Sequence, residues 1–138
     1  MAVDYVLTYD ASATANKKVK ATNLSKFSKE FTSADQTISA AGLLTLAHGM
    51  GASPSVVMYY LICQTGELGY SAGDVVHISV ESDSNNTVPR SFTSVLDSTN
   101  ISIRFGNTNP PFALLNKSTG AIAAITSANW KFRVKAWA

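Results

Sequence analysis

The last strand-like segment, Asn129 to Trp137, constrains the fold of this chain more than any other feature. Its apolar and basic residues alternate, with one face holding Trp130, Phe132, Val134 and Ala136 and the other holding Lys131, Arg133 and Lys135. A period of two residues is that of a β-strand with one buried face. We therefore predict a closing strand whose apolar row fills a core and whose basic row faces solvent.

The preceding segments, from Thr32 onward, alternate strand patterns with turn residues about every eight to twelve positions. Ser55 to Thr65 is apolar on both faces, which predicts a central strand. Further strands are predicted at Gln36 to Ala47, Asp74 to Ser82, Asn100 to Phe105, Phe112 to Leu115 and Ala121 to Thr126. Inward-facing side chains in two of them are expected to be Val76, Ile78, Val80, Ile101, Ile103 and Phe105. This rhythm predicts an all-β fold, an antiparallel β-sandwich of jelly-roll or lectin-like type with about seven or eight strands.

The first 31 residues differ from this body. Val3, Tyr5, Leu7 and Tyr9 alternate as in a strand, and a polar stretch over residues 10–16 then predicts a turn. Beyond it the helical spacing of Leu24, Phe27 and Phe31 fits a short amphipathic helix, whose apolar patch is too thin to fold alone. We predict an extended N-terminal arm over residues 1–31 that needs a partner, and one sandwich domain over residues 32–138.

The charge distribution excludes several classes of protein. The net charge is +2, and five lysines lie in the arm, while the body from Thr32 onward balances six basic against six acidic residues. A strongly basic face, as nucleic-acid binding requires, is therefore not expected. The single cysteine, Cys63, allows no internal disulfide and favours synthesis in a reducing cytoplasm. No apolar run approaches the ~20 residues that span a bilayer, so we expect no membrane insertion and no Sec-type export.

The sequence offers little material for catalysis. Cys63 lies in the most apolar strand, where a thiol is usually inert. A glycosidase pair would have to come from Glu67, Asp74, Glu81 and Asp83, but carboxylates in turns and at strand ends are ordinarily solvated. Neither a phosphate-binding loop, a nucleophile elbow nor a set of spaced metal ligands is present. We predict no enzyme, no cofactor and no metal site.

Binding is the more plausible chemistry, and the histidines are its first candidates. His48, between Ala47 and two glycines, is either a ligand contact or a side chain that fixes its loop. His77 points away from the core side of its strand, which favours a surface or a subunit contact. A sugar would need an exposed ring beside amide or charged groups. The polar loop candidates for this contact are Asn85, Asn86, Arg90, Asn107 and Asn109.

The aromatic candidates for stacking on a sugar are Tyr59, Tyr70, Trp130 and Trp137. The alternation of Trp130 with Phe132 and Val134 places it in the core instead. Trp137 has three possible roles. It could stack on a sugar, it could contact a neighbouring subunit, since tryptophan is enriched in such contacts, or it could fill the interior.

Three elements together resemble a known family. They are the loop Ala47-His48-Gly49-Met50-Gly51, the Pro54 that leads into the apolar strand Val56 to Cys63, and the closing strand Trp130 to Trp137. This pattern resembles the C-terminal β-domains of tailed-bacteriophage fibre and head-surface proteins, and covers about Thr32 to Ala138. The arm, from Tyr9 through Leu24, looks like the connector that precedes such domains. A shorter likeness to H-type lectins rests on Pro54-Ser55-Val56 and Trp137-Ala138, and no sugar-binding residues are carried over from it.

The resemblance implies a virion component that is made in the host bacterial cytoplasm, displayed on the particle surface and assembled as a homotrimer. The chain is short for a host-recognising fibre, so a capsid decoration protein or a short head fibre fits at least as well. The alternative is a receptor-binding, lectin-like tail-fibre tip that recognises a bacterial surface glycan. Attachment to other virion proteins would run through the arm, at Tyr5, Leu7, Tyr9, Lys17, Lys18, Val19 and Leu24. Trp137 and His77 are the expected contacts between subunits.

Overall fold

The computed structural model of the protein describes residues 5–8, 17–20, 29–80 and 90–138. Within those ranges the chain is nearly all β, and a single 3-10 turn, Ser127–Asn129, is the only helical element. The strands are β1 (Tyr5–Thr8), β2 (Lys17–Lys20), β3 (Glu30–Thr32), β4 (Leu43–Ala47), β5 (Val56–Cys63), β6 (Val75–Ile78), β7 (Phe92–Leu96), β8 (Asn100–Phe105), β9 (Ala113–Leu115), β10 (Ile122–Ala124) and β11 (Trp130–Trp137). No helix in the described part is long and apolar enough to cross a membrane.

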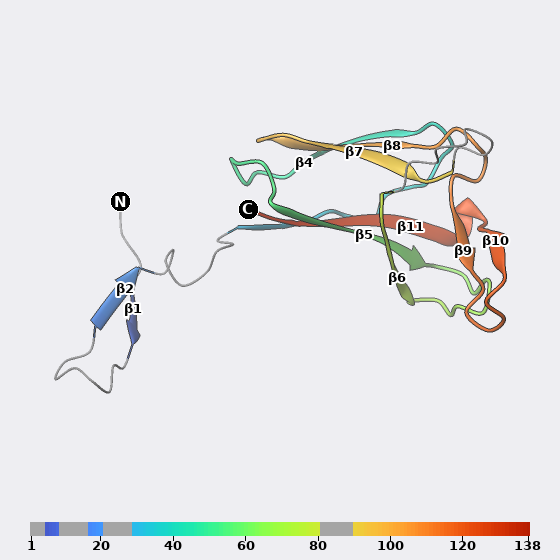
Figure 1. Ribbon diagram of the computed structural model, residues 1–138, viewed down its shortest axis with the longest axis horizontal. Coiled ribbons are helices and arrows are strands. Elements are labelled where there is room, and N and C mark those ends of the chain that lie inside the picture. The colour runs from blue at the N-terminus through green and yellow to red at the C-terminus, as the bar shows by residue number, and fades with distance from the viewer. Residues whose placement is uncertain (1–4, 9–16, 21–28, 81–89) are drawn as a thin grey trace.

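Two stacked antiparallel sheets form the domain. A four-stranded sheet has the order β3-β11-β5-β6, and a three-stranded sheet has the order β4-β8-β7. Figure 1 shows these sheets one above the other, with the short β9-β10 ribbon at one end. The two sheets together hold seven strands, four plus three. The predicted fold class, an all-β antiparallel sandwich, is confirmed.

The closing strand β11 supplies the centre of the core. Its four apolar residues, Trp130, Phe132, Val134 and Ala136, are each 0% exposed. Aromatic rings gather around Phe132: its centroid lies 5.1 Å from that of Phe105 and 5.2 Å from that of Phe92. The opposite row is half-buried, because Arg133 is paired with Asp35 at 2.7 Å and Lys131 donates to the Thr37 hydroxyl at 3.3 Å. The predicted alternation is confirmed, although the basic row is less open to solvent than expected.

The central position of β5 is also confirmed, since it pairs with β11 on one side and with β6 on the other. In β8 the predicted inward residues Ile101, Ile103 and Phe105 are all buried. β9 and β10 lie within the two strands predicted at Phe112 to Leu115 and Ala121 to Thr126, and they pair with each other. Val80 was expected to point inward but is 45% exposed. β6 ends at Ile78, so the strand alternation no longer sets the direction of that side chain.

One predicted strand needs correction, and one strand was missed. The strand expected over Gln36 to Ala47 is shorter, because Ala41 has a positive φ of 53° and the regular strand starts only at Leu43. Ile38 is buried nonetheless. The segment that leads into β4 runs along the edge of the core, because the backbones of Gln36 and Phe132 exchange hydrogen bonds there. β7 was not predicted. Its apolar residues do not alternate: Phe92 is buried, while Val95 is 63% exposed.

The boundary between arm and domain lies earlier than predicted. Glu30 and Phe31 belong to β3, which pairs with β11, so Phe31 is in a strand and not in a helix. The backbones of Lys29 and Ala138 exchange two hydrogen bonds of 3.1 Å, which fasten the entry of the domain to the end of its closing strand. Leu24, Phe27 and Tyr9 lie outside the described residues. The strand predicted around Tyr5 and Leu7 is confirmed as β1, whereas β2 was not predicted.

Candidate functional site

The sequence-predicted ligand residues lie at opposite ends of the sandwich. β8 runs from the turn at Asp97 to Asn100, beside the His48 loop, to the segment that contains Asn107 and Asn109 at the other end. The end with the His48 loop is also the end where Lys29 enters the domain, as Figure 1 shows. The structure therefore separates His48 from the other predicted contacts. We call these two ends the arm end and the far end.

At the arm end, His48 is a buried structural residue, 6% exposed. Its Nδ1 accepts a hydrogen bond from the Met50 N–H at 3.2 Å, and its Nε2 lies 3.1 Å from the Asp97 carbonyl oxygen. Because Nδ1 acts as an acceptor, the neutral tautomer with the proton on Nε2 satisfies both contacts. Gly49 and Gly51 have positive φ angles of 64° and 70°, and this conformation lets the backbone turn tightly around the His48 side chain. His48 thus fixes its loop, which is the structural one of its two expected roles.

At the far end, Arg90 holds the segment that follows Asn109. Its guanidinium Nη1 donates to the carbonyl oxygen of Pro110 at 2.8 Å and to that of Phe112 at 3.4 Å. Asn107 and Asn109 are exposed next to this segment, whose Asn109-Pro110 peptide bond is cis. Asn85 and Asn86 lie outside the described residues. The structure thus brings together three of the predicted loop contacts, Arg90, Asn107 and Asn109.

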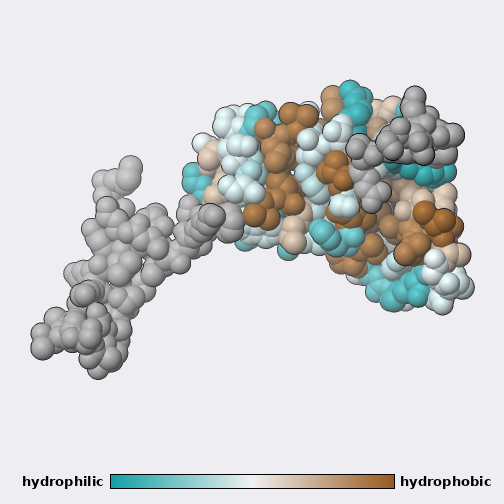
Figure 2. Space-filling model, viewed as in Figure 1, coloured by the Kyte–Doolittle hydropathy of each residue, from teal (hydrophilic) through white to brown (hydrophobic). Residues whose placement is uncertain are grey.

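A cleft of ≈ 490 Å³ opens beside Arg90. It lies between the end of β6, at His77 to Ser79, and the β9-β10 ribbon, at Phe112 to Leu115 and Ile122. Leu115 is 60% exposed and Ile122 is 74% exposed, and Figure 2 shows brown, hydrophobic surface in this region of the domain. The volume falls within the range of small-ligand sites, about 300–1,000 Å³. A lining that combines apolar side chains with one guanidinium and one imidazole suits a ligand that is partly apolar and carries hydrogen-bond acceptors.

Three of the four aromatic candidates for sugar stacking pack or form hydrogen bonds within the domain instead. Tyr59 is 8% exposed, and its hydroxyl donates to the Ser94 hydroxyl oxygen at 2.7 Å. The ring of Tyr70 packs edge-on against that of Trp130 at 5.4 Å, and the Tyr70 hydroxyl donates to the Leu115 carbonyl oxygen at 3.0 Å. Trp130 lies in the core, as predicted. Trp137 is half-buried on the outer face of the four-stranded sheet, so the alternative that it fills the interior is wrong.

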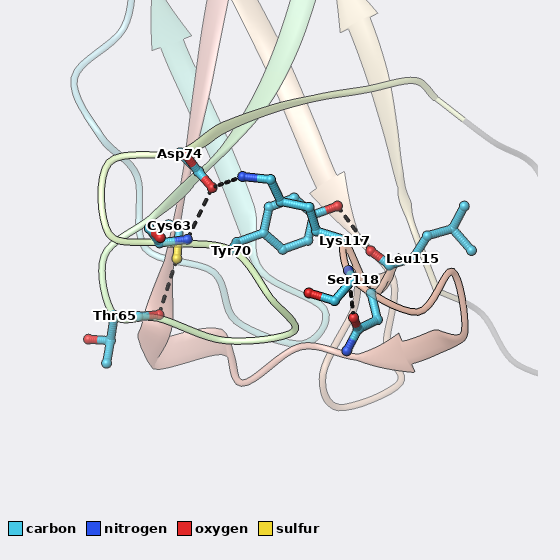
Figure 3. A network of polar contacts seen from close by, with 9 residues as sticks. Cys63, Thr65, Tyr70, Asp74, Leu115, Lys117 and Ser118 are labelled. Carbon is cyan, nitrogen blue, oxygen red and sulfur yellow. Dashed lines mark hydrogen bonds and ion pairs between the residues drawn. The ribbon is translucent and has the colours of Figure 1, made fainter.

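A polar network, shown in Figure 3, joins the loop after β5 to the β9-β10 ribbon. Lys117 donates to the Asp74 carboxylate at 2.8 Å, and the Ser71 N–H donates to the same oxygen at 3.0 Å. These two contacts, that of Lys117 first, lower the pKa of Asp74. Nearby, the thiol of Cys63 donates to the Thr65 carbonyl oxygen at 3.1 Å, and burial raises its pKa, aided by the negative charge of Asp74. A buried thiol with a raised pKa is a poor nucleophile.

Glu67 has a structural role in the same region. Its carboxylate accepts the Trp130 Nε1–H at 2.7 Å and the Thr126 N–H at 2.9 Å. Burial alone would raise the pKa of Glu67, but the hydrogen bonds from Thr126, Trp130 and Asn129 outweigh it and lower that pKa. Glu67 is therefore an anion fixed in place, unlike the proton donor that a glycosidase needs. Glu81 and Asp83 lie outside the described residues, and the part of the chain that is described has no group of three or more metal-ligating side chains.

The predicted attachment residues of the arm are organised as a hairpin. Tyr5 and Leu7 lie in β1, while Lys17, Lys18 and Val19 lie in β2. The two strands are antiparallel, and Leu7 pairs with Lys18 and Tyr5 with Lys20. Tyr9 and Leu24 lie outside the described residues. The pairing brings five of the seven predicted attachment positions into one element.

Sequence reasoning missed one surface, the outer face of β5. The two-sided apolar pattern of this strand predicted its central position but not the exposure of one face, where Val56 and Met58 are each 37% exposed while Ile62 is 6% exposed. The same face carries His77, which pairs with Tyr60 across β5 and β6. The sequence feature that could have indicated this surface is the absence of charged residues along Val56 to Cys63. Such a stretch is as typical of a surface that contacts another molecule as of a strand in the core.

A comparison with protein-family models and a comparison with curated protein sequences both returned no match for this chain.

Proposed function

We propose that this chain is a bacteriophage virion protein displayed on the particle surface, either a capsid decoration protein or a short fibre, anchored through its N-terminal arm. The observation that carries the proposal is the backbone pairing of Lys29 with Ala138, which puts the entry from the arm at one end of the sandwich. The cleft and the exposed asparagines lie at the other end. A domain tethered at one end projects its opposite end outward, and this is the arrangement that a surface-displayed module needs.

The β1-β2 hairpin supports the same proposal. Its register joins four residue pairs, and a two-stranded hairpin is at best marginally stable alone in water. A surface on another virion protein would supply the missing contacts. Lys17, Lys18 and Lys20 make an acidic surface the natural complement. The domain is proposed to assemble as a homotrimer, with nucleic acid and membrane playing no part in its attachment.

A receptor-binding tip is the second candidate function, and the far-end cleft favours it. Arg90 uses Nη1 on backbone carbonyl oxygens. A guanidinium has five N–H donors in all, so others can meet glycan hydroxyls or acidic groups. Under this proposal a bacterial surface glycan occupies the cleft beside His77 and Arg90.

Deleting residues 1–28 separates the two functions. The remaining chain keeps Lys29 and its backbone pair with Ala138, so the sandwich should fold. If the chain is a virion surface protein, the shortened chain no longer joins particles and does not bind host cells. If it is a receptor-binding tip, the shortened chain still binds host cells, and Arg90→Ala weakens that binding. Averaged electron micrographs of intact particles that carry the tagged chain would then place it on the head or on the tail.

A further inference from the structure

The positive charge of Arg90 has no carboxylate partner in the described part of the chain. The ion pairs between described side chains are those of Lys117 with Asp74 and of Arg133 with Asp35. Arg90 lines the far-end cleft, and none of the described residues that line this cleft is acidic. An anionic group on a bound ligand would therefore complement the charge of the cleft.

Two backbone carbonyl groups fix the orientation of the Arg90 guanidinium. Its Nη1 donates to the carbonyl oxygens of Pro110 and Phe112, and these two bonds use both N–H groups of that nitrogen. Among the described residues, the Nε and Nη2 groups have no hydrogen-bond acceptor. The edge formed by Nε and Nη2 has two parallel N–H groups, which is the geometry that binds both oxygens of a carboxylate. Because the guanidinium is already held in place, it loses little conformational entropy when a ligand binds.

Arg133 shows the same edge in contact with a carboxylate. Its Nε donates to an Asp35 carboxylate oxygen at 2.7 Å, and its Nη2 lies 2.7 Å from the same oxygen. Arg104 lies in the other sheet, outside the cleft, and its Nη1 donates to the Ala41 carbonyl oxygen at 2.9 Å. The edge that binds Asp35 in Arg133 is thus the edge that is left open in Arg90.

The backbone next to Arg90 is held in a strained conformation. Ser91, which also lines the cleft, has a φ of 99°, in the region that favours glycine. Its N–H donates to the Pro111 carbonyl oxygen at 2.6 Å, and its own carbonyl oxygen accepts the Gly106 N–H at 2.8 Å. Residues in such conformations cluster at ligand-binding sites, where the surrounding structure holds them in place. The strain at Ser91 is a second observation, independent of charge, that favours a binding site here.

The walls of the cleft favour a ligand with an apolar part. Leu115 and Ile122 are paired across the β9-β10 ribbon, and both line the cleft. They are 60% and 74% exposed, so most of their surface is open to a ligand. An inorganic anion would meet the guanidinium of Arg90 but would leave these side chains in water.

We infer that the far-end cleft binds a carboxylate that carries an apolar group. The carboxylate lies against the Nε and Nη2 groups of Arg90, and the apolar group lies against Leu115 and Ile122. The inference rests on the cleft that the receptor-binding function uses, and it narrows the ligand from a glycan in general to an acidic one. Two sources have this chemistry, an acidic sugar that bears an acyl group and an organic acid without a sugar.

The test follows the amide NMR signals of the full, isotope-labelled chain during titration with four compounds. N-acetylneuraminate and 4-phenylbutyrate are the acids, and N-acetylneuraminic acid methyl ester and 4-phenylbutyramide are their neutral counterparts. We expect each acid to bind about tenfold more tightly than its counterpart, because hydrogen bonds between charged groups are about twice as strong as neutral ones. The signals that shift should be those of residues 77–79, 90–91, 112–115 and 122.

Two variants locate the carboxylate on Arg90. Arg90→Lys keeps the positive charge but has no pair of parallel N–H groups, so it should weaken both acids about tenfold and leave the neutral compounds unchanged. Arg104→Lys is the matched control, because it removes another guanidinium that donates to a backbone carbonyl but lies outside the cleft. It should bind all four compounds as the wild type does. If the spectrum of Arg90→Lys shows an altered fold, the comparison of acids with neutral counterparts on the wild type decides.

The two acids also separate the two sources of the ligand. Tighter binding of N-acetylneuraminate would support an acidic glycan and, with it, the receptor-binding function. Tighter binding of 4-phenylbutyrate would support the carboxylate site but count against a glycan as its occupant. Equal binding of each acid and its neutral counterpart, signal changes confined to other parts of the chain, or no binding of either acid would overturn the inference. Attachment through the arm would stand in each of these cases.

Discussion

Glu67→Gln should destabilise the domain at neutral pH, although the substitution preserves shape and hydrogen-bonding reach. The carboxylate accepts the Nε1–H of Trp130, a residue that is 0% exposed, and the N–H of Thr126. A glutamine has one acceptor oxygen, and its amide group would face donors. The Thr126 N–H lies 2.9 Å from one carboxylate oxygen and 3.1 Å from the oxygen that accepts the Trp130 N–H. A glutamine whose oxygen stays on Trp130 therefore opposes its amide N–H to that of Thr126, and the Trp130 N–H exchanges a charged partner for a neutral one.

The expected magnitude follows from these two losses. A hydrogen bond to a charged group contributes about 1.5–3 kcal/mol and a neutral one about 0.5–1.5 kcal/mol. The Thr126 N–H lies in an exposed segment and can turn to water, so the Trp130 contact dominates. We expect a loss of about 2 kcal/mol, or roughly 8 °C in Tm for a domain of this size. Urea unfolding followed by tryptophan fluorescence measures it.

The pH dependence gives a sharper test. The pKa of Glu67 is lowered in the folded state, so its contribution is complete above the unfolded-state value, about 4.3, and is lost as the pH falls through the lower folded-state value. The difference in stability between the wild type and Glu67→Gln should be largest near pH 7 and should shrink below about pH 4. Asp35→Asn is the matched control, because its partly exposed pair with Arg133 should contribute no more than about 1 kcal/mol. Equal losses in the two variants at pH 7, or a Glu67→Gln difference that persists at low pH, would refute the reasoning.

Three further measurements test other parts of the fold. His48→Ala leaves the Met50 N–H and the Asp97 carbonyl without their side-chain partner and should cost about 2–3 kcal/mol in denaturant unfolding, whereas a cost under about 0.5 kcal/mol would contradict its loop-fixing role. Phe132→Ala removes the ring at the centre of the aromatic cluster and should cost about 3–5 kcal/mol, a claim that an unchanged Tm would contradict. Cys63, 1% exposed and with a raised pKa, should resist a thiol reagent at pH 8 until the chain unfolds, and rapid labelling of the native protein would show that the strand is more open than described.

The fold could be predicted from the sequence wherever one strand face is apolar and the other polar. β8 and β11 have this pattern, and their buried residues were identified one by one. β7 lacks it, since Phe92 and Val95 stand at odd spacing, and only its pairing with β8 makes it a strand. Pairing with distant residues also decides β3, because Glu30 and Phe31 meet β11 about a hundred residues later in the chain.

The candidate site was less predictable. Whether Arg90 meets Phe112, or Glu67 meets Trp130, depends on loop paths that no local pattern specifies. The partial exposure of the outer face of β5 could not be predicted, for a different reason. An apolar side chain that is covered by a neighbouring molecule and one that is covered by the core of its own chain leave the same pattern in a sequence.

Attachment through the arm is the central claim, and incorporation of the chain into particles tests it most directly. Particles that lack the protein would be incubated with the full chain or with residues 29–138, then sedimented, and the pellets assayed for each. The proposal predicts that the full chain sediments with the particles and that residues 29–138, although folded, stay in the supernatant. Equal sedimentation of the two chains would contradict it, because the sandwich alone would then be sufficient for attachment.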